Sequence, residues 1–223
     1  MTAPVEVTVA GILFDMDGVL ISSIASVNRC WKRWAHHYGV AGADTYEIPH
    51  GTRAVDIIKT LTPDLDVAEG LRLIEDMEIE DVSDLVVLPG ASALLNSLPP
   101  ERWAIVTSAT KRLLLGRLRA AQFSIPDRII SGDMVVHGKP DPEPYRRGAE
   151  LLGFPANDCL VVEDAPSGIG SGIAAGCPVL GVLGSYSESE LRAAGARWVV
   201  PSLEHLRAET LQNGLRLSLD SLA

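Results

Sequence analysis

Short runs of apolar residues alternate with helical patterns along most of this 223-residue chain. Runs of this kind, bounded by glycine, proline or polar residues, are typical of strands that are buried on both faces of a sheet. They lie at 9–14, 103–107, 128–130, 159–163, 178–183 and 197–200. Helical patterns lie between most of them, at 111–121, 142–152, 168–175 and 188–194. The alternation predicts an α/β fold with a parallel sheet and helices on both of its faces.

One interval interrupts this alternation. Between residues 23 and 87 apolar side chains recur at steps of three and four, which is the spacing of amphipathic helices. The residues in question are Ile24, Val27, Trp31, Trp34 and Tyr38, followed by Val67, Leu71, Ile74 and Met77. We therefore predict a helical domain at 23–87 that is inserted, after the first strand, into a core domain formed by 1–22 and 88–223.

Composition restricts the partners that the chain can have. Apolar residues make up 47% of it, which suffices for a well-buried core, and the formal net charge is -10. A negative surface repels phosphate backbones, so we expect no binding to nucleic acid. No apolar run approaches the roughly 18 residues of a membrane span, and the three cysteines lack the spacing of a metal site. We expect a cytoplasmic protein that does not bind membranes.

Two aspartates directly follow the first predicted strand. In such sheets, ligands bind beyond the carboxyl ends of the strands, where the strand order reverses. Asp15 and Asp17 lie at such an end, and Gly18 lets the chain turn away. One carboxylate can attack phosphorus while the other gives a proton to the departing oxygen. A turn or a helix cap would use the same residue types, so this motif alone leaves a purely structural role open.

Two further segments suit a phosphate group. Ser108 and Ala109 follow the strand at 103–107, where a hydroxyl and the free N–H groups of a helix start can bind phosphoryl oxygens. Helix capping by Ser108 or Thr110 is the alternative. Lys139 lies between a glycine and a proline, which restrict the backbone around a side chain that is costly to order. A solvated loop lysine is the alternative there.

Two adjacent acids end the apolar strand at 159–163. Glu163 and Asp164 would be costly to bury without a cation. Mg²⁺ takes oxygen ligands, keeps several waters and bridges to phosphate, so it is the natural partner. We therefore predict a Mg²⁺ site at this strand end, with capping of the following helix by Asp164 as the alternative.

Taken in this order, the motifs resemble those of the haloacid dehalogenase superfamily of phosphohydrolases. The resemblance covers essentially the whole chain and is greatest to sugar- and polyol-phosphate phosphatases of the 2-deoxyglucose-6-phosphatase, glycerol phosphatase and hexitol phosphatase types. It rests on the segments FDMDGVL, HGTRAVD, LPGA, RWAIVTSAT, GKPDPEPY, VVEDAPSGI and AGARWVV. The resemblance implies a Rossmann-like core, a small helical cap after the first strand and a small phosphorylated metabolite as substrate. We expect a monomer or a weak dimer.

The resemblance implies roles for individual residues. Asp15 would be the nucleophile that becomes phosphorylated, and Asp17 would be the general acid and base. The phosphoryl oxygens would be bound by Ser108, Ala109 and Lys139. The ligands of Mg²⁺ would be Asp15, Asp17 through its main-chain carbonyl, Asp164 and Glu163, the last of these directly or through water.

Substrate specificity is expected to come from the helical insertion. His50 and Arg53 belong to the polar cluster most suited to face the site, where they could bind a hydroxyl or the phosphate. Lys111 is a further candidate for contact with an anion, and Asp56 is expected to pair with a neighbouring base. Ser22 departs from the acidic residue that many relatives carry, a difference shared by some sugar- and polyol-phosphate phosphatases.

Two other functions remain open. A β-phosphoglucomutase-like phosphotransferase would share these motifs, but it must protect its phosphorylated aspartate from water by tight closure of the cap. A non-catalytic receiver-like domain would also have an acidic pocket, but it would be much shorter and lack the insertion at 23–87. Release of phosphate from a hexose phosphate, as opposed to its isomerisation, separates the phosphatase from the mutase.

Overall fold

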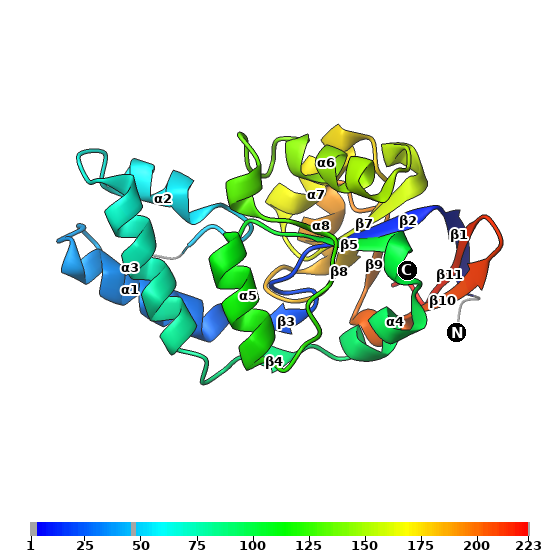
Figure 1. Cartoon of the computed structure of the whole chain (residues 1–223), viewed down its shortest axis with the longest axis horizontal. Coiled ribbons are helices and arrows are strands. Elements are labelled where there is room, and N and C mark those ends of the chain that lie inside the picture. Colours follow the sequence, from blue (N-terminus) through cyan, green and yellow to red (C-terminus); the bar gives the residue numbers. More distant parts are fainter. Residues whose placement is uncertain (1–3, 46–47, 223) are drawn as a thin grey trace.

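A parallel six-stranded sheet lies at the centre of the molecule, with helices packed on both sides of it (Figure 1). The computed structural model describes residues 4–45 and 48–222. Positions 1–3 and 223 of the predicted core and 46–47 of the predicted insertion lie outside the described residues. The architecture confirms the predicted α/β fold class.

The sheet has the strand order β6-β5-β2-β7-β8-β9. Its strands are β2 (Gly11–Phe14), β5 (Trp103–Val106), β6 (Ile129–Ile130), β7 (Cys159–Glu163), β8 (Val179–Val182) and β9 (Trp198–Val200). Each strand lies within one of the predicted apolar runs, and β2, β5, β7 and β8 are buried throughout because both faces of the sheet are covered. The chain adds strands first on one side of β2 and then on the other. The strand order therefore reverses at β2, which is where a ligand is expected.

Successive side chains of each strand point to opposite faces of the sheet and pack into two separate apolar clusters. Helices α4 (Ala91–Ser97) and α5 (Lys111–Ala120) pack against the cluster that contains Ile12 and Phe14. The other cluster contains Leu13 and is covered by α6 (Glu143–Leu152), α7 (Pro166–Ala175) and α8 (Glu188–Ala193). Among the described residues, the helices are either too short or too polar to cross a bilayer.

A second, antiparallel sheet joins the two ends of the chain. It consists of β1 (Val5–Val9), β10 (Leu206–Leu211) and β11 (Gly214–Leu219), with β11 in the middle. Its inner leucines, Leu215, Leu217 and Leu219, are fully buried in the same cluster as α4. The apolar runs did not predict this sheet, because its strands alternate between polar and apolar residues and one of them pairs across almost the whole length of the chain.

The segment between β2 and α4 forms a separate group of helices. Helices α1 (Ile24–His37), α2 (Ala54–Leu61) and α3 (Val67–Glu80) surround their own apolar cluster, which includes Trp34, Ile58 and Ile74. They lie at one end of the molecule, away from the antiparallel sheet (Figure 1). The chain enters and leaves this group through β3 (Ile21–Ser22) and β4 (Val86–Val87), which pair with each other.

Candidate active site

The carboxyl ends of β2 and β7 place three acids next to one another. Phe14 is in register with Val162, and the N–H of Asp15 donates a hydrogen bond to the carbonyl of Val162 at 3.0 Å. Asp15 therefore lies beside Glu163 and Asp164, which follow Val162 in the chain. All three acids are buried. The strand ends predicted from the sequence thus do meet at one point of the sheet.

Lys139 is buried among these acids. Its ammonium group donates hydrogen bonds to Asp15 Oδ1 at 2.6 Å, to Glu163 Oε1 at 2.6 Å and to the carbonyl of Val106 at 3.1 Å. Burial lowers the pKa of Lys139, but the attraction of Asp15 and Glu163 outweighs this effect and holds the pKa above its usual value. Lys139 is a fixed positive charge of the site and not a solvated loop lysine.

Glu163 holds this lysine in place. Its carboxylate also accepts hydrogen bonds from the hydroxyl of Tyr145 at 2.6 Å and from the main-chain N–H groups of Asp164 and Ala165 at 3.1 and 3.3 Å. Both oxygens of Glu163 are therefore occupied by protein donors. The role of Tyr145 was not foreseen, although its position on the buried face of α6, just after the Lys139 loop, was a usable signal.

Asp164 differs from Glu163 in its partners. Within 4–45 and 48–222 no side chain or main-chain donor bonds its carboxylate, and burial raises its pKa well above the usual value. Burial also raises the pKa of Asp15 to about 7, against the opposing effect of Lys139. Gly18 makes room for the Asp164 carboxylate, since a Cβ at Gly18 would lie 2.0 Å from Asp164 Oδ2. Its φ of +87° also favours glycine at this position.

These carboxylates fit a divalent cation. Oxygens of Asp15, Glu163 and Asp164 lie within 4.8 Å of one another. A buried carboxylate that accepts no hydrogen bond is stabilised by a cation that prefers oxygen ligands. A divalent cation would also favour the ionised form of the neighbouring carboxylates. The alternative of helix capping does not apply, because α7 is capped at Ala165 without a side-chain hydrogen bond.

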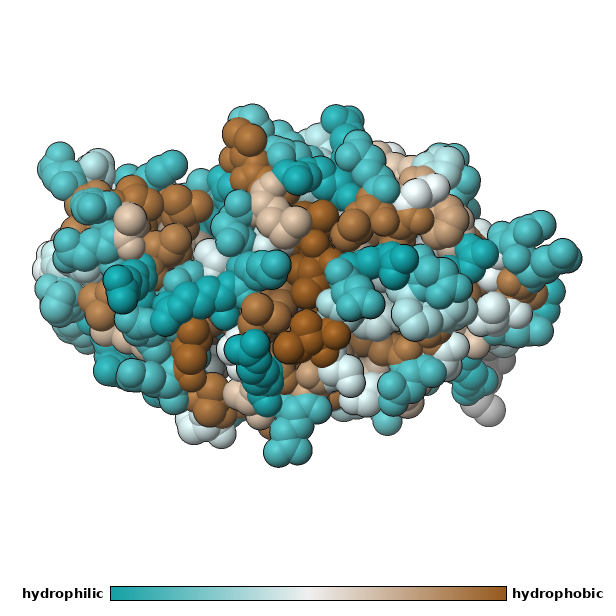
Figure 2. Space-filling model, viewed as in Figure 1, coloured by the Kyte–Doolittle hydropathy of each residue, from teal (hydrophilic) through white to brown (hydrophobic). Residues whose placement is uncertain are grey.

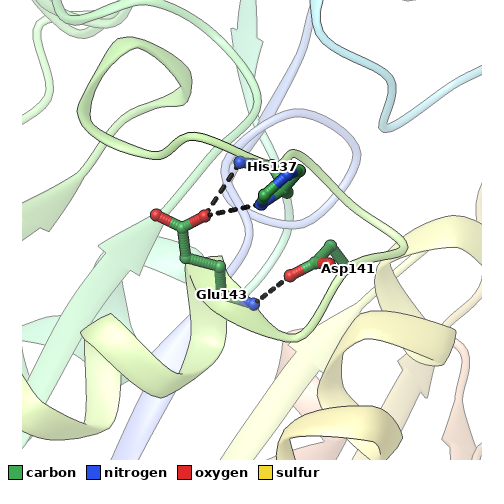
Figure 3. A group of neighbouring side chains, drawn as sticks. All are labelled: His137, Asp141 and Glu143. Atoms are coloured by element: carbon green, nitrogen blue, oxygen red, sulfur yellow. Dashed lines mark hydrogen bonds and ion pairs between the residues drawn. The ribbon is translucent and has the colours of Figure 1, made fainter.

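A second acidic group, formed by His137, Asp141 and Glu143, lies next to Lys139 in the chain (Figure 3). The Glu143 carboxylate accepts hydrogen bonds from the N–H groups of Val136 and His137 at 2.9 and 2.8 Å. Asp141 Oδ1 accepts one from the N–H of Glu143 at 2.9 Å. These acids are thus used to brace the loop that carries Lys139 against the start of α6.

Asp17 lies beside the buried group and is held by two side chains. Its Oδ1 accepts a hydrogen bond from Ser23 Oγ at 2.7 Å, and its Oδ2 pairs with Arg117 Nη1 at 2.6 Å. Arg117 Nη2 pairs with Glu78 Oε2 on α3 at 2.7 Å. Burial lowers the pKa of Arg117, but the attraction of Asp17 and Glu78 outweighs it and raises the pKa above its usual value.

Neither Arg117 nor Glu78 was singled out from the sequence. A signal was nevertheless present, because both are charged residues on the apolar face of a helix. Arg117 lies among Leu113, Leu114 and Leu118 of α5, and Glu78 continues the helical spacing of Leu71 and Ile74 on α3. A charge at such a position indicates a buried partner on another element.

A cavity of about 110 Å³ lies between the strand ends and helices α1–α3. Asp15, Asp17 and Asp164 line its floor. The opposite wall is mainly apolar and includes Ile24, Val27, Trp31, Ile48, Ile57, Leu71 and Ile74. The polar groups on this wall include Glu75, Glu78 and His50. The cavity therefore joins an acidic floor to a mostly apolar chamber.

Of the three residues expected to bind phosphate, Ser108 and Ala109 line this cavity, whereas Lys139 does not line it and bonds Asp15. The Ser108 hydroxyl donates a hydrogen bond to the carbonyl of Gly51 at 2.6 Å, and the N–H of Ala109 donates one to Thr107 Oγ1 at 3.1 Å. Thr110, not Ser108, caps α5, since its side chain accepts from the N–H of Leu113. The structure thus leaves Ser108 free of a capping role and ties it to the loop before α2.

Two residues expected to contact substrate lie elsewhere. Arg53 was expected to face the site, but its guanidinium pairs with Asp56 at 2.7 Å and donates to the carbonyls of Val135 and Val136 at 3.0 and 3.1 Å. These acceptors draw its side chain away from the cavity, and the expected pairing of Asp56 with a base is confirmed. Lys111 is exposed at the start of α5 and does not line the cavity.

Comparison with known proteins agrees with this geometry. Residues 9–176 match the family of haloacid dehalogenase-like hydrolases. The chain is 35% identical to hexitol phosphatase A of Escherichia coli, covering 92% of this chain and 96% of that protein. It is 32% identical to glycerol-1-phosphate phosphohydrolase 1 of Saccharomyces cerevisiae, covering 92% and 87%. The crystal structure of a hydrolase from Pseudomonas syringae superposes with a TM-score of 0.76 at 25% identity, covering 86% of this chain and 93% of that one.

Proposed function

Because this chain belongs to the haloacid dehalogenase-like hydrolases, we propose that it is a phosphatase that hydrolyses the phosphate monoester of a small sugar or polyol. The observation that carries the proposal is the meeting of Asp15, Asp17 and Asp164 at one cavity, with the buried Lys139 bonded to Asp15. Transfer of a phosphoryl group to a carboxylate requires a nucleophile and a proton donor, which Asp15 and Asp17 can provide from their different surroundings. It also requires positive charge, which can come from the buried Lys139 and from a cation bound at Asp164.

The proposed reaction has two steps. Asp15 attacks phosphorus, the bond from phosphorus to the sugar or polyol oxygen breaks, and Asp17 donates a proton to that oxygen. Asp17 then takes a proton from a water whose oxygen attacks phosphorus and displaces the Asp15 carboxylate. Lys139 stabilises negative charge at Asp15 and on the phosphoryl oxygens throughout. Ser108 and the N–H of Ala109 bind those oxygens once the Ser108 hydroxyl leaves the carbonyl of Gly51 and the N–H of Ala109 leaves Thr107 Oγ1.

Asp15, Asp164 and the main-chain carbonyl of Asp17 would hold a Mg²⁺ ion. When bound, the ion would neutralise charge on the transferring phosphoryl group. The lack of a donor to the Asp164 carboxylate, among the residues that the structure describes, supports this role. Glu163 already bonds four protein groups, so we assign it to the support of Lys139 and to contact with the ion through water.

We further propose that residues 23–87 form a cap over a core of residues 1–22 and 88–223, and that the cap selects the leaving group. Its cavity wall is apolar apart from groups such as Glu75 and Glu78, whose carboxylates repel an anionic leaving group. A neutral alcohol with hydroxyl groups suits this wall better than an acid does. His50, which also lines the cavity, can hydrogen-bond one such hydroxyl.

The test is release of phosphate from glycerol 1-phosphate, 2-deoxyglucose 6-phosphate and a hexitol phosphate, with and without Mg²⁺. The wild-type protein should release phosphate only when Mg²⁺ is present. Asp15→Asn should abolish release, because an amide cannot attack phosphorus in place of the carboxylate. Near-normal turnover by Asp15→Asn would contradict the proposal, and isomerisation of a hexose phosphate without release would assign the chain to the mutases.

A further inference from the structure

We infer that Arg117 is the positioning residue for Asp17, and that Glu78 of α3 in turn orients Arg117. The inference rests on the function proposed above, in which Asp17 exchanges a proton with the leaving group and with water. It adds to that function a chain of three charged side chains, Asp17–Arg117–Glu78, which runs from the reacting centre to the helical insertion.

The contacts leave Asp17 little freedom. Its two oxygens are held separately, Oδ1 by Ser23 Oγ at 2.7 Å and Oδ2 by Arg117 Nη1 at 2.6 Å. Arg117 itself is fixed at both ends of its guanidinium, since Nη2 lies 2.7 Å from Glu78 Oε2. Its side chain is 6% exposed. A planar guanidinium that bonds two carboxylates at once fixes direction as well as charge.

The place of this chain argues for a role in the reaction. Arg117, Glu78 and Asp17 all line the cavity. A buried ion pair at such a position contributes little to stability compared with well-packed apolar residues, so stability alone does not account for it. Proton transfer, in contrast, depends steeply on the position of the acid relative to the leaving oxygen.

The same two helices supply a matched control. Arg112, also on α5, pairs with Glu75 and Asp76 of α3 at 3.1 and 2.5 Å. It therefore links α5 to α3 as Arg117 does, but its ion pairs do not include Asp17, and its side chain is 50% exposed. Any effect that comes only from loosening α3 against α5 should be seen in Arg112→Met as well.

The experiment measures release of the alcohol in the first turnover, with Mg²⁺, for glycerol 1-phosphate and for p-nitrophenyl phosphate. A glycerol oxygen needs a proton in order to leave, whereas p-nitrophenolate does not. Arg117→Met should lower the rate for glycerol 1-phosphate by roughly 100-fold, with little change in KM, but the rate for p-nitrophenyl phosphate by only a few-fold. Arg117→Lys should recover part of the loss, and Arg112→Met should behave like the wild-type protein.

A folding defect is excluded by a second variant. Arg117→Met leaves Asp17 and Glu78 without their cation, whereas Arg117→Met/Glu78→Met removes the unpaired acid on α3 as well. The double variant should regain thermal stability and still show the selective loss on glycerol 1-phosphate.

Three outcomes would overturn the inference. They are equal losses on both esters, a rise in KM at unchanged turnover, and recovery of the glycerol 1-phosphate rate in the double variant. Each of them presupposes an active wild-type protein. A wild-type protein that releases phosphate from neither ester would overturn the proposed function itself, and the inference with it.

Discussion

A single ammonium group lies between two buried carboxylates at the end of the central strand. Lys139 bonds Asp15 and Glu163 at 2.6 Å each, and its side chain is 1% exposed. Charges at this depth are tolerated only in pairs, since removal of one partner leaves the other without compensation. The lysine therefore keeps the acids of the site together, and we propose that it also supplies positive charge to a bound phosphoryl group.

Lys139→Met should therefore damage both folding and activity. We expect the free energy of unfolding to fall by ~3 kcal/mol, because Asp15 and Glu163 lose their shared cation. Phosphate release should become undetectable. Urea unfolding and a phosphate-release assay measure the two effects, and Lys59→Met, on the exposed face of α2, is the control. A stable and active Lys139→Met protein would contradict both roles.

The individual residues of the site differ in how far the sequence could indicate them. Asp15 and Asp164 directly follow apolar strands, and the ends of adjacent parallel strands must meet, so their proximity was predictable. The pairing of Arg117 with Asp17 was not, because it depends on where α5 lies relative to β2 and on how α3 packs against α5. The position of the Arg53 side chain was not predictable for a similar reason, since its acceptors, the carbonyls of Val135 and Val136, lie far away in the chain.

At the scale of elements, the contact between α3 and α5 connects the helical insertion to the sheet domain. It contains the ion pairs of Arg112 and Arg117, and the second of these buries Glu78. Burial raises the pKa of Glu78 from 4.5 to about 7, although Arg117 opposes this effect. A carboxyl group whose pKa is higher in the folded state favours folding at low pH, and this contribution is lost as the pH rises through the folded pKa.

Glu78→Gln should therefore alter the pH dependence of stability between about pH 4.5 and 7. Over this interval the wild-type protein should lose up to ~3 kcal/mol of unfolding free energy relative to the variant, because Glu78 must ionise in a buried place. Unfolding in urea at a series of pH values measures the difference. Glu80→Gln, exposed on the same helix, should follow the wild-type curve. Parallel curves for the wild type and Glu78→Gln would show that Glu78 does not titrate in this range.

The elements themselves were predictable to different degrees. Strands β5 and β7 are continuous apolar runs between turn residues, and α5 and α6 have helical spacing, so both classes were recognised within one or two residues. The antiparallel sheet was missed, since the pairing of Val5 with Leu219 joins segments from opposite ends of the chain. Such pairing forms between segments that are distant in the sequence, and a local pattern of residues does not indicate which distant segment will be the partner.

At the scale of the whole molecule, negative charge dominates. The net charge is -10, and hydrophilic residues cover most of the face seen in Figure 2, with hydrophobic ones near its middle and over the end that holds helices α1–α3 (Figure 1). An acidic protein repels an anionic substrate at long range, so attraction to phosphate must arise locally. Lys139 supplies one positive charge, against three negative charges when Asp15, Glu163 and Asp164 are all ionised. A bound divalent cation would neutralise this excess of negative charge at the point where phosphate arrives.

Mg²⁺ should therefore stabilise the folded protein. A ligand that binds only the native state at about 100 times its Kd adds ~2.7 kcal/mol, which is visible as a rise in Tm. We expect Mg²⁺ to raise the Tm of the wild-type protein, but not that of Asp164→Asn, which retains only one oxygen acceptor in place of a carboxylate. Asp141→Asn, in the acidic group next to Lys139, should respond like the wild type. Equal shifts in all three proteins would place the ion elsewhere.

The pairing of β3 with β4 affects which parts of the molecule can change in sequence without disturbing the sheet. Ile21 lies opposite Val87, so the chain leaves the sheet domain and returns to it at neighbouring positions. A different helical segment between these two points would leave the β2 register, Asp15 and Asp164 untouched, but it would replace Ser23 and Glu78, which hold Asp17 and Arg117. We therefore expect that another helical segment at 23–87 could change substrate preference and keep the chemistry only if it again supplied a hydroxyl for Asp17 and an acid for Arg117.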